Sequence, residues 1–579
     1  MLGKANLESG ELEDAPTRTA TLDLTIENEM KKNLSSYVMV FVLLAVHCSL
    51  SYAGAVGKPY YRVNQGAGWN ASGWNRFYSQ DQGSRIIPYS WIVALKQPDG
   101  QLFLRDSLSR YGYIKNAKNA FNPQSLPVGF LVVGSGSNAA QFSMTCAACH
   151  TRQITVGEKN YRIDGGPSLS DPFNFFKDLE TAVGFTLDSP AAFTEFQNSV
   201  KAQGQPAPSR DELNAWYQPY HVLISKSFTD TTMPYGVGRL DALGLIQNRA
   251  AGLDIGLASD AHLIPGNISP ATVPVRFPFI WNAPKQDLTQ WAGTTTNGND
   301  SYALQRNGLE VIGVFGYLYP VPDPSKYNGA NFLSQNSLNY NGLKQAENLV
   351  KKIGPPKWPW SINHQLVKRG QIIYAAECGP GCHEIAKGEP RPPQKHTWKT
   401  PILNVGTDTR YYETLALKTV SSGLLTGTVN PFSSSPEPIP ATGAPPISLV
   451  NDLSASALFQ KYPNINLTPK APANGVGSFE SRVLQGIWAA APYLHNGSVP
   501  SLTELLKPAA QRAKVFKVGP SYDIESVGLA SDQPFGATSV TVTTDCSHLA
   551  SGNSNCGHEF GVWLSPDDKA ALLEYLKTL

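Results

Sequence analysis

Two cysteine pairs, each followed directly by a histidine, are the residues best suited to chemistry in this chain. The first reads Cys146-Ala-Ala-Cys149-His150, which has the C-x-x-C-H spacing of covalent c-type haem attachment. Two thiols one helical turn apart reach the two vinyl groups of a haem, and the adjacent imidazole lies under the iron. A zinc site would need four ligands, and a thioredoxin-type pair would need a βαβ context; neither is found nearby. We therefore predict a covalent haem here.

The second motif has three residues between its cysteines and reads Cys378-Gly-Pro-Gly-Cys382-His383. Cysteines four positions apart still share one helix face, and Gly-Pro-Gly can bend the backbone so that both sulfurs reach the ring. Residues 370–376 are expected to form the helix that leads into the motif. A disulfide or a zinc pair is the alternative interpretation. We favour haem, so the expected cofactors are two covalently bound c-type haems.

Three further cysteines complete the total of seven. Cys48 belongs to a segment that is expected to be removed from the mature chain. Cys546 and Cys556 flank a loop rich in Ser, Gly and Asn. In an exported chain these two remaining thiols most simply form a disulfide.

The N-terminal region has the pattern of a secretory signal. A basic start at residues 30–32 precedes an apolar stretch over 37–46 and small residues near the expected cleavage point. We expect translation to begin at Met30 and cleavage to follow near Ala53, so that residues 1–53 are absent from the mature chain. This predicts a periplasmic or secreted protein. A short buried helix in a cytoplasmic protein is the alternative.

The composition is that of a loop-rich globular protein. Of the 579 residues, 41% are hydrophobic and 16% are charged, and glycine (50) and proline (44) are frequent. The net charge of +2 predicts no nucleic-acid partner. The mature chain has no apolar run of the roughly 18 residues that a membrane span requires, so no span is expected.

Several stretches resemble the bacterial di-haem cytochrome c peroxidase (MauG) superfamily. The matching stretches are 276–283 (RFPFIWNA), 290–293 (QWAG), 307–310 (NGLE) and 486–498 (GIWAAAPYLHNGS), which look like the W-N-A, W-D-G-R, N-x-x-E and A-P-Y-x-H-x-G elements of that family. Residues 145–151, 163–167 and 238–244 look closer to its larger branch, which includes rubber oxygenases. The resemblance covers roughly residues 130–579.

This resemblance implies roles for three residues. Trp291 matches the tryptophan between the two haems, Glu310 the distal acid of the peroxidatic haem, and His495 the second-domain histidine near the haems. The sequence departs from the family because W-D-G-R reads W-A-G-T and the distal glutamine has no clear counterpart. The blocking histidine expected soon after His150 is also absent. A salt-bridged acid at Glu310 and a core aromatic at Trp291 are the structural alternatives.

The resemblance further implies a mostly α fold, with two cytochrome c-like haem domains, long loops and little β structure. We expect an N-terminal segment at 54–130, a first haem domain at 131–335, and a second at 336–579 with an exposed Pro/Ser-rich insertion near 431–447. A closing helix should begin at Ser565-Pro566, because serine caps helices and proline suits the first helical position.

Histidine is the expected sixth ligand of the second haem. Methionine is the usual ligand of a high-potential haem, but only Met144 and Met233 remain after signal removal. Met144 is too close to the first motif, and Met233 is a weak candidate. His558 is favoured because the expected disulfide and the closing helix hold its loop, with His495 and His548 as alternatives. The expected iron ligands are thus the histidines of the two motifs and His558.

These features predict an exported di-haem oxidoreductase of the peroxidase type. The first haem would activate H2O2 or O2 beside Glu310, and the second would relay electrons. The expected partners are the small oxidant and either a small redox-protein donor or an apolar substrate. One alternative is an oxygenase of an apolar substrate, which the chain length and the missing blocking histidine favour. The other is a pure electron carrier in which both irons have six ligands.

Overall fold

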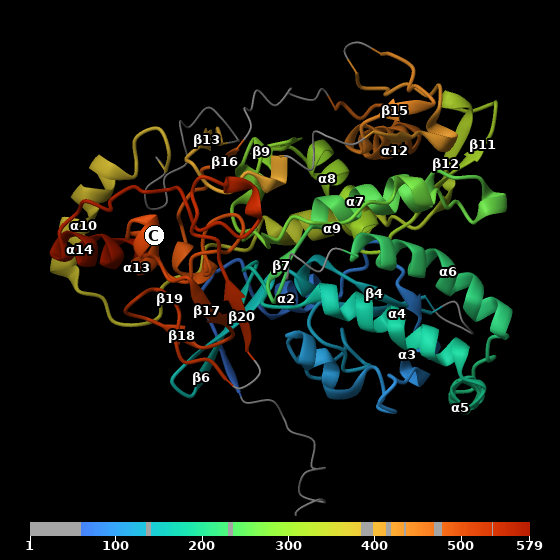
Figure 1. Ribbon diagram of the computed structural model, residues 1–579, viewed down its shortest axis with the longest axis horizontal. Helices are drawn as coiled ribbons and strands as arrows, with labels where there is room; N and C mark the ends of the chain where they lie inside the picture. Colours follow the sequence, from blue (N-terminus) through green and yellow to red (C-terminus); the bar gives the residue numbers. More distant parts are fainter. Residues whose placement is uncertain are drawn as a thin grey trace, which may run out of the picture. The chain divides into compact units, whose positions relative to one another are not determined.

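The computed structural model describes residues 59–134, 140–229, 235–383, 398–412, 419–433, 436–467, 477–534 and 537–579. Tyr60–Leu579 form one compact unit (Figure 1). The expected signal segment lies outside the described residues. The predicted boundary between residues 335 and 336 falls within this unit, so the division into two haem domains stays a prediction.

Helices form the larger part of the regular structure. The α-helices among the described residues are α2 (Ala71–Ser79), α3 (Tyr89–Ala94), α4 (Pro172–Asp188), α5 (Pro190–Ala202), α6 (Arg210–Ser227), α7 (Ala242–Arg249), α8 (Asp300–Gly313), α9 (Tyr340–Val350), α10 (His364–Glu377), α12 (Pro446–Lys461), α13 (Leu502–Leu505) and α14 (Pro566–Lys577).

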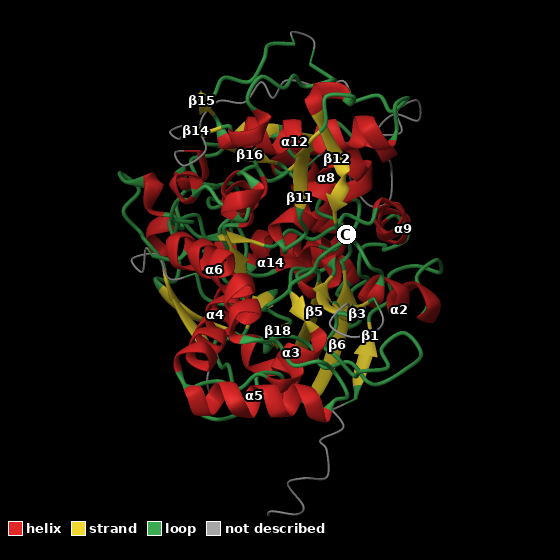
Figure 2. Ribbon diagram, turned by 90° about the vertical axis from the view of Figure 1, so that its right-hand side faces the viewer, coloured by secondary structure: helices red, strands yellow, loops and turns green. Residues whose placement is uncertain are grey.

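The strands are short and pair in twos and threes among loops and helices (Figure 2). One three-stranded sheet has the order β1 (Tyr60–Arg62), β6 (Lys159–Asp164), β5 (Thr151–Val156), and the other has the order β2 (Ile87–Pro88), β4 (Gln141–Met144), β3 (Phe130–Val133). The paired strands are β7 (Arg239–Leu240) with β8 (Val275–Arg276), β9 (Leu288–Thr289) with β10 (Thr295–Thr296), β11 (Leu318–Pro322) with β12 (Ala330–Asn336), β13 (Ile402–Asn404) with β16 (Ser478–Glu480), β14 (Val420–Ser421) with β15 (Thr442–Ala444), β17 (Val515–Val518) with β20 (Thr538–Thr541), and β18 (Tyr522–Asp523) with β19 (Gly528–Leu529).

The expectation of little β structure is therefore corrected. Helix makes up 39% and strand 17% of the structure, so the fold is mixed although helix predominates. For most of the strands the reason lies in their length. Strands of two or three residues are too short to show the alternation of apolar and polar residues by which a strand is recognised in a sequence.

The first cysteine motif occupies a tight turn between two sheets. Strand β4 leads into a 3-10 turn at Cys146–Ala148, and β5 leaves it. Thr145 caps the turn, because its hydroxyl accepts a hydrogen bond from the Ala147 N–H at 3.2 Å. The His150 N–H donates to the Cys146 carbonyl at 2.9 Å, which closes one helical turn over the motif.

Gly129 supports this turn from the side of β3. Its carbonyl accepts from the Thr145 N–H at 2.8 Å. Gly129 has a left-handed φ of +83°, and an added Cβ would overlap the backbone nitrogen of Ala148. Only glycine therefore allows the chain to pass so close to the motif.

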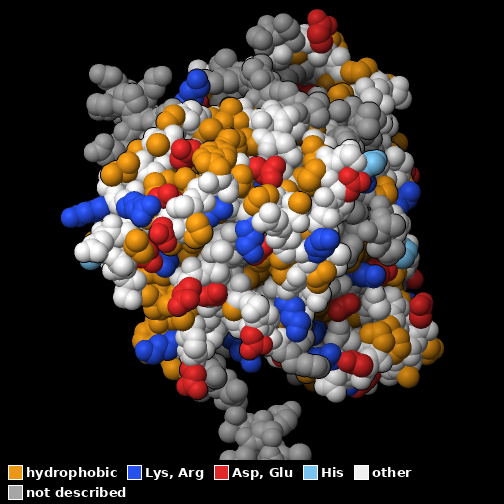
Figure 3. Space-filling view, turned by 60° about the vertical axis from the view of Figure 1, so that its left-hand side comes forward, with side chains coloured by type: hydrophobic (Ala, Val, Ile, Leu, Met, Phe, Trp, Pro, Cys, Tyr) orange, Lys and Arg blue, Asp and Glu red, His pale blue; other side chains and the backbone are white. Residues whose placement is uncertain are grey.

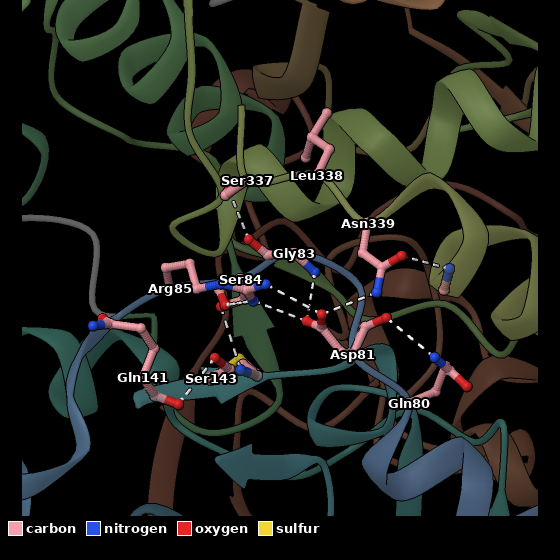
Figure 4. Close-up of polar contacts among 12 residues, drawn as sticks. Gln80, Asp81, Gly83, Ser84, Arg85, Gln141, Ser143, Ser337, Leu338 and Asn339 are labelled. Atoms are coloured by element: carbon pink, nitrogen blue, oxygen red, sulfur yellow. Dashed lines mark hydrogen bonds and ion pairs between the residues drawn. The ribbon is translucent and has the colours of Figure 1, made fainter. Parts of the chain in front are cut away.

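The N-terminal segment is an integral part of the same unit. Strand β1 pairs in parallel with β6, and the loop at 80–85 is fixed by contacts with distant segments (Figure 4). The Asp81 carboxylate accepts from Arg85 at 2.8 Å and from Asn339 at 3.0 Å. The Ser337 hydroxyl donates to the Gly83 carbonyl at 2.8 Å. These bonds fix the loop that presents Gln82 to the first motif.

The helix expected before the second motif and the expected closing helix are both confirmed. Helix α10 contains residues 370–376 and ends directly before the motif. Helix α14 begins at Pro566 after the capping Ser565. The two helices pack at Gly370, where an added Cβ would overlap the Ala571 carbonyl oxygen, so glycine is required at this crossing.

The surface carries both signs of charge. On the face shown in Figure 3, basic and acidic side chains are interspersed instead of gathered by sign. The described part of the Pro/Ser-rich segment at 431–447 is mostly exposed and leads through β15 into α12. No helix among the described residues has the length and apolar character needed to cross a membrane.

Replacing Gly129 with Ala should lower the free energy of unfolding by roughly 2 to 5 kcal/mol, through backbone overlap and an unfavourable φ. Gly157→Ala is the matched control, because Gly157 has φ +58° but nothing within 4 Å of an added Cβ. Its loss should be only about 1 to 2 kcal/mol. Denaturant unfolding measures both variants, and equal losses would show that the contact at Gly129 does not support the motif.

Candidate functional site

A cavity of about 200 Å³ adjoins the first cysteine motif. Cys146, Cys149 and His150 line it together with Glu310 and Trp291. The fold thus brings two of the three predicted catalytic residues to the first motif, from segments more than a hundred residues further along the chain. The third, His495, does not line the cavity.

His150 is oriented as a metal ligand. Its Nδ1 lies 2.9 Å from the Pro278 carbonyl oxygen. A carbonyl can only accept a hydrogen bond, so Nδ1 carries the proton and Nε2 keeps its lone pair. Burial lowers the pKa of His150 to about 4, so the ring is neutral at physiological pH. A neutral imidazole whose second nitrogen is anchored is the form that binds a metal.

The two thiols of the motif are half-buried and protonated. Burial raises the pKa of Cys146 and of Cys149 to about 12. A thioredoxin-type pair works through a thiolate with a lowered pKa, so this environment does not fit that chemistry. The cavity, the two thiols and the oriented imidazole together fit a covalently attached haem.

Glu310 lies in the cavity beside a glutamine that the sequence analysis did not identify. The Gln290 amide donates a hydrogen bond to the Glu310 carboxyl. Burial raises the pKa of Glu310, while the bond from Gln290 and the charge of Arg306 oppose this rise. Gln290 directly precedes Trp291, and left-handed backbone at both residues turns it toward the acid. Such a turn is not visible in the sequence.

Gln82 is a second polar residue that sequence reasoning missed. Its amide oxygen accepts from the Cys146 N–H at 3.2 Å and lies 3.1 Å from the Cys146 Sγ. Its amide nitrogen is buried without a hydrogen-bond partner, and the side chain lines the cavity. No motif marks Gln82, because it comes from the N-terminal segment, which lies outside the family resemblance.

Trp291 forms part of the cavity wall between two buried guanidinium groups. Its indole N–H donates to the Arg276 carbonyl at 3.1 Å, and the Arg276 and Arg482 guanidinium carbons lie 4.8 and 5.9 Å from the ring centre. His495 meets the Trp291 ring edge-to-face at 6.5 Å and stacks on Phe479 at 3.7 Å. His495 therefore packs behind the tryptophan. Burial lowers its pKa to about 3.

The second motif repeats the arrangement of the first. His383 Nδ1 donates to the Arg482 carbonyl at 2.7 Å, which again leaves Nε2 with its lone pair. Burial lowers the pKa of His383. Cys378 is a free thiol, and burial raises its pKa to about 11, which does not support the disulfide alternative.

His558 lies opposite His383. The two ring centres are 6.4 Å apart. An imidazole nitrogen binds a transition metal at about 2 Å, and its ring centre lies about 1 Å further away, so two imidazoles sharing one iron have centres about 6 Å apart. The His558 Nδ1 is buried without a partner, and burial lowers the pKa of this histidine to about 4. The pair fits a haem iron.

The loop that carries His558 is held by backbone contacts and by a disulfide. Cys546 and Cys556 are bonded, which confirms the predicted pairing. The Arg512 guanidinium donates to the Gly557 carbonyl at 2.8 Å and to the His558 carbonyl at 3.2 Å. His548, the alternative in the same loop, is 82% exposed at its side chain and pairs with an aspartate. Its position does not fit a haem ligand.

The remaining candidates have other surroundings. Met144 is buried in β4 and lines the first cavity. Met233 lies outside the described residues. Among the residues that the structure describes, no group of three or more His, Cys, Asp or Glu side chains could hold a metal ion by itself.

Comparison with known proteins gives one family match and two relatives. Residues 478–517 match a family described as RoxA-like, cytochrome c-like. The uncharacterized protein y4iJ of Sinorhizobium fredii is 31% identical over 593 aligned positions, which cover 88% of this chain and 92% of y4iJ. The uncharacterized protein y4iM of the same organism is 24% identical over 54% of this chain and 66% of its own length. A cytochrome c-like segment implies a c-type haem and suggests an oxidoreductase.

Replacing His558 with Ala should convert one low-spin haem iron to a high-spin or water-ligated form, because the imidazole facing His383 is lost. The absorption and EPR spectra of the purified protein measure this change. His548→Ala, in the same loop, is the control and should leave both spectra unchanged. An unaltered spectrum for His558→Ala would exclude it as a ligand of the second haem.

Proposed function

The chain belongs to the family of the Sinorhizobium fredii protein y4iJ, and from this premise we propose that it is an exported di-haem oxidoreductase that activates H2O2 or O2 at the first motif. The observation that carries the proposal is that the histidines of both motifs are anchored alike, through Nδ1, to a backbone carbonyl. The match to a RoxA-like cytochrome c family at 478–517, beside both sites, supports it.

The residues that would hold the cofactors can be named. Cys146 and Cys149 would form thioethers to one haem with His150 as its iron ligand, and the Cys378-x-x-x-Cys382-His383 motif would hold the other. A bound c-type haem supplies an iron that accepts and releases single electrons. His383 and His558 would hold the second iron between them, which suits electron relay. No second histidine faces His150 among the described lining residues of the first cavity.

Glu310 is placed to hold and release a proton in the first cavity. Its raised pKa keeps the carboxyl protonated to a higher pH than an ordinary glutamate. The bond from Gln290 fixes the orientation of the carboxyl. Cleavage of an O–O bond needs a proton on the departing oxygen, and a positioned acid of this kind contributes about 10²- to 10⁴-fold to the rate.

Trp291 is proposed to form the contact between the two sites, and His495 to support it. The Trp291 ring lines the first cavity and lies 5.9 Å from the guanidinium carbon of Arg482, whose carbonyl binds His383. The stacked pair of His495 and Phe479 holds the ring from behind. The buried guanidinium groups beside the Trp291 ring disfavour a positive charge on that ring. We therefore propose that Trp291 relays electrons and positions its neighbours, and that it does not store an oxidising equivalent.

An oxygenase acting on an apolar substrate is the second candidate function. The first cavity is lined on one side by aliphatic residues of α7, α8 and α9, among them Leu243, Leu245, Ile246, Val311 and Val350. Such a wall suits an apolar molecule better than a small polar oxidant alone. In the peroxidase alternative, reduction of H2O2 to water takes two electrons from a redox-protein donor and two protons.

An absorption spectrum separates an enzyme from a pure electron carrier, and activity assays then separate the peroxidase from the oxygenase. Cyanide or peroxide should change the absorption spectrum of one haem only, whereas a pure carrier with two six-coordinate irons would show no change. Consumption of peroxide with a reduced small cytochrome then supports the peroxidase. Oxygenated products from O2 and an apolar polyene support the oxygenase.

Glu310→Gln should slow peroxide-driven oxidation by about 10²- to 10⁴-fold while both haems stay attached, because the amide has no acidic proton to transfer. The wild-type rate should fall as pH rises through the raised pKa of Glu310, since the protonated form is lost there. The variant should lack this decline. Stopped-flow kinetics over a pH series measures both effects, and a wild-type rate in the variant would contradict the role.

A further inference from the structure

Arg482 contacts both candidate haem sites. Its carbonyl accepts the hydrogen bond from His383 Nδ1 at 2.7 Å, and its side chain lines the cavity of the first motif. Arg482 is 7% exposed, so the whole residue lies between the two sites and away from water.

The guanidinium of Arg482 is fixed on three sides. It lies over the Phe279 ring, 4.1 Å from its centre. It donates to the Gln286 side chain at 3.0 Å and lies 3.4 Å from the Glu480 carboxylate. These contacts hold the side chain rigidly, so the position of the Arg482 carbonyl depends on what the guanidinium binds.

Phe279 connects this guanidinium to the first motif. It follows Pro278, whose carbonyl accepts from His150 Nδ1 at 2.9 Å. A continuous set of contacts therefore runs from His150 through Pro278 and Phe279 to Arg482 and then to His383. The two motif histidines are linked by one stacked pair and two hydrogen bonds.

Two nitrogens of Arg482, Nε and Nη1, make no hydrogen bond, although Nε lies 3.4 Å from the Glu480 carboxylate. Its Nη1 is buried without a hydrogen bond, on a side chain that lines the cavity. A buried, unsatisfied guanidinium N–H costs free energy unless a polar group completes it. Arg276, also buried at this cavity, carries a second positive charge there. The cavity thus suits a ligand with a carboxylate, such as the propionate of a haem.

We propose that Arg482 couples the two sites. Its Nη1 binds a carboxylate of the haem at the first motif, while its carbonyl sets the strength of the hydrogen bond to His383. Binding at the first motif thereby fixes the ligand geometry at the second. This inference rests on the proposed function, because it requires a haem at each motif.

The coupling predicts opposite shifts in the two reduction potentials of Arg482→Gln. Loss of a buried cation should lower the potential of the first haem, because the oxidised iron is then less disfavoured. In the variant the Arg482 carbonyl is held less firmly, which weakens its hydrogen bond with His383. His383 then donates less electron density to the iron, so the reduction potential of the second haem should rise. Spectroelectrochemical titration of the two haems measures both potentials.

Arg276→Gln is the matched control. Arg276 is equally buried and lines the same cavity, but it makes no bond to His383. It should lower the potential of the first haem and leave the second unchanged. If Arg482→Gln gives the same pattern as Arg276→Gln, or shifts neither potential, the coupling is wrong.

Phe279→Leu provides a second test if Arg482→Gln does not fold. It removes the stacking ring and keeps every hydrogen bond of Arg482, so it should raise the potential of the second haem by a smaller amount. An unchanged second potential would overturn the coupling. The mass of the wild-type protein separates the two claims. A wild-type chain without two haems refutes the proposed function. Two haems in the wild type, with unshifted potentials in the variants, refute only the coupling.

Discussion

The hydrogen bond from a buried histidine Nδ1 to a backbone carbonyl, made once at each motif, is the interaction on which the rest of the structure depends. It places the proton on one nitrogen and the lone pair on the other. The two acceptors, Pro278 and Arg482, belong to segments far from the motifs in sequence. Much of the chain between and after the motifs is therefore needed to position two carbonyl oxygens.

Close backbone packing explains how these carbonyls are held. Gly129 lies against the first turn, and Gly370 allows α10 to meet α14 before the second. In the same interior, the Trp281 and Trp488 indoles donate to the carbonyls of Gln485 and Pro356 at 2.7 and 2.9 Å. Each such bond is worth only about 1 kcal/mol, but loss of one leaves a buried polar group unsatisfied and costs more.

The features that could be predicted from the sequence are those fixed by local spacing. The 546–556 disulfide, the helix that leads into the second motif and the closing helix follow from residues close together in the chain. The strands of two or three residues could not be predicted, because so few residues show no period. The sequence does not reveal Gln290, because a left-handed turn places it beside Glu310. It does not reveal Gln82, because a long-range loop contact brings that residue to Cys146. Sequence could favour His558, but only the fold shows that it faces His383 at 6.4 Å.

The central claim is that two haems are bound, one at each anchored histidine. The intact mass of the protein, purified from cells that export it and attach c-type haem, tests this most directly. The account predicts the mature chain plus two haem groups, with one carried by the peptide of each motif. A chain that carries a single haem, with the thiols of either motif free to react with an alkylating reagent, would contradict it.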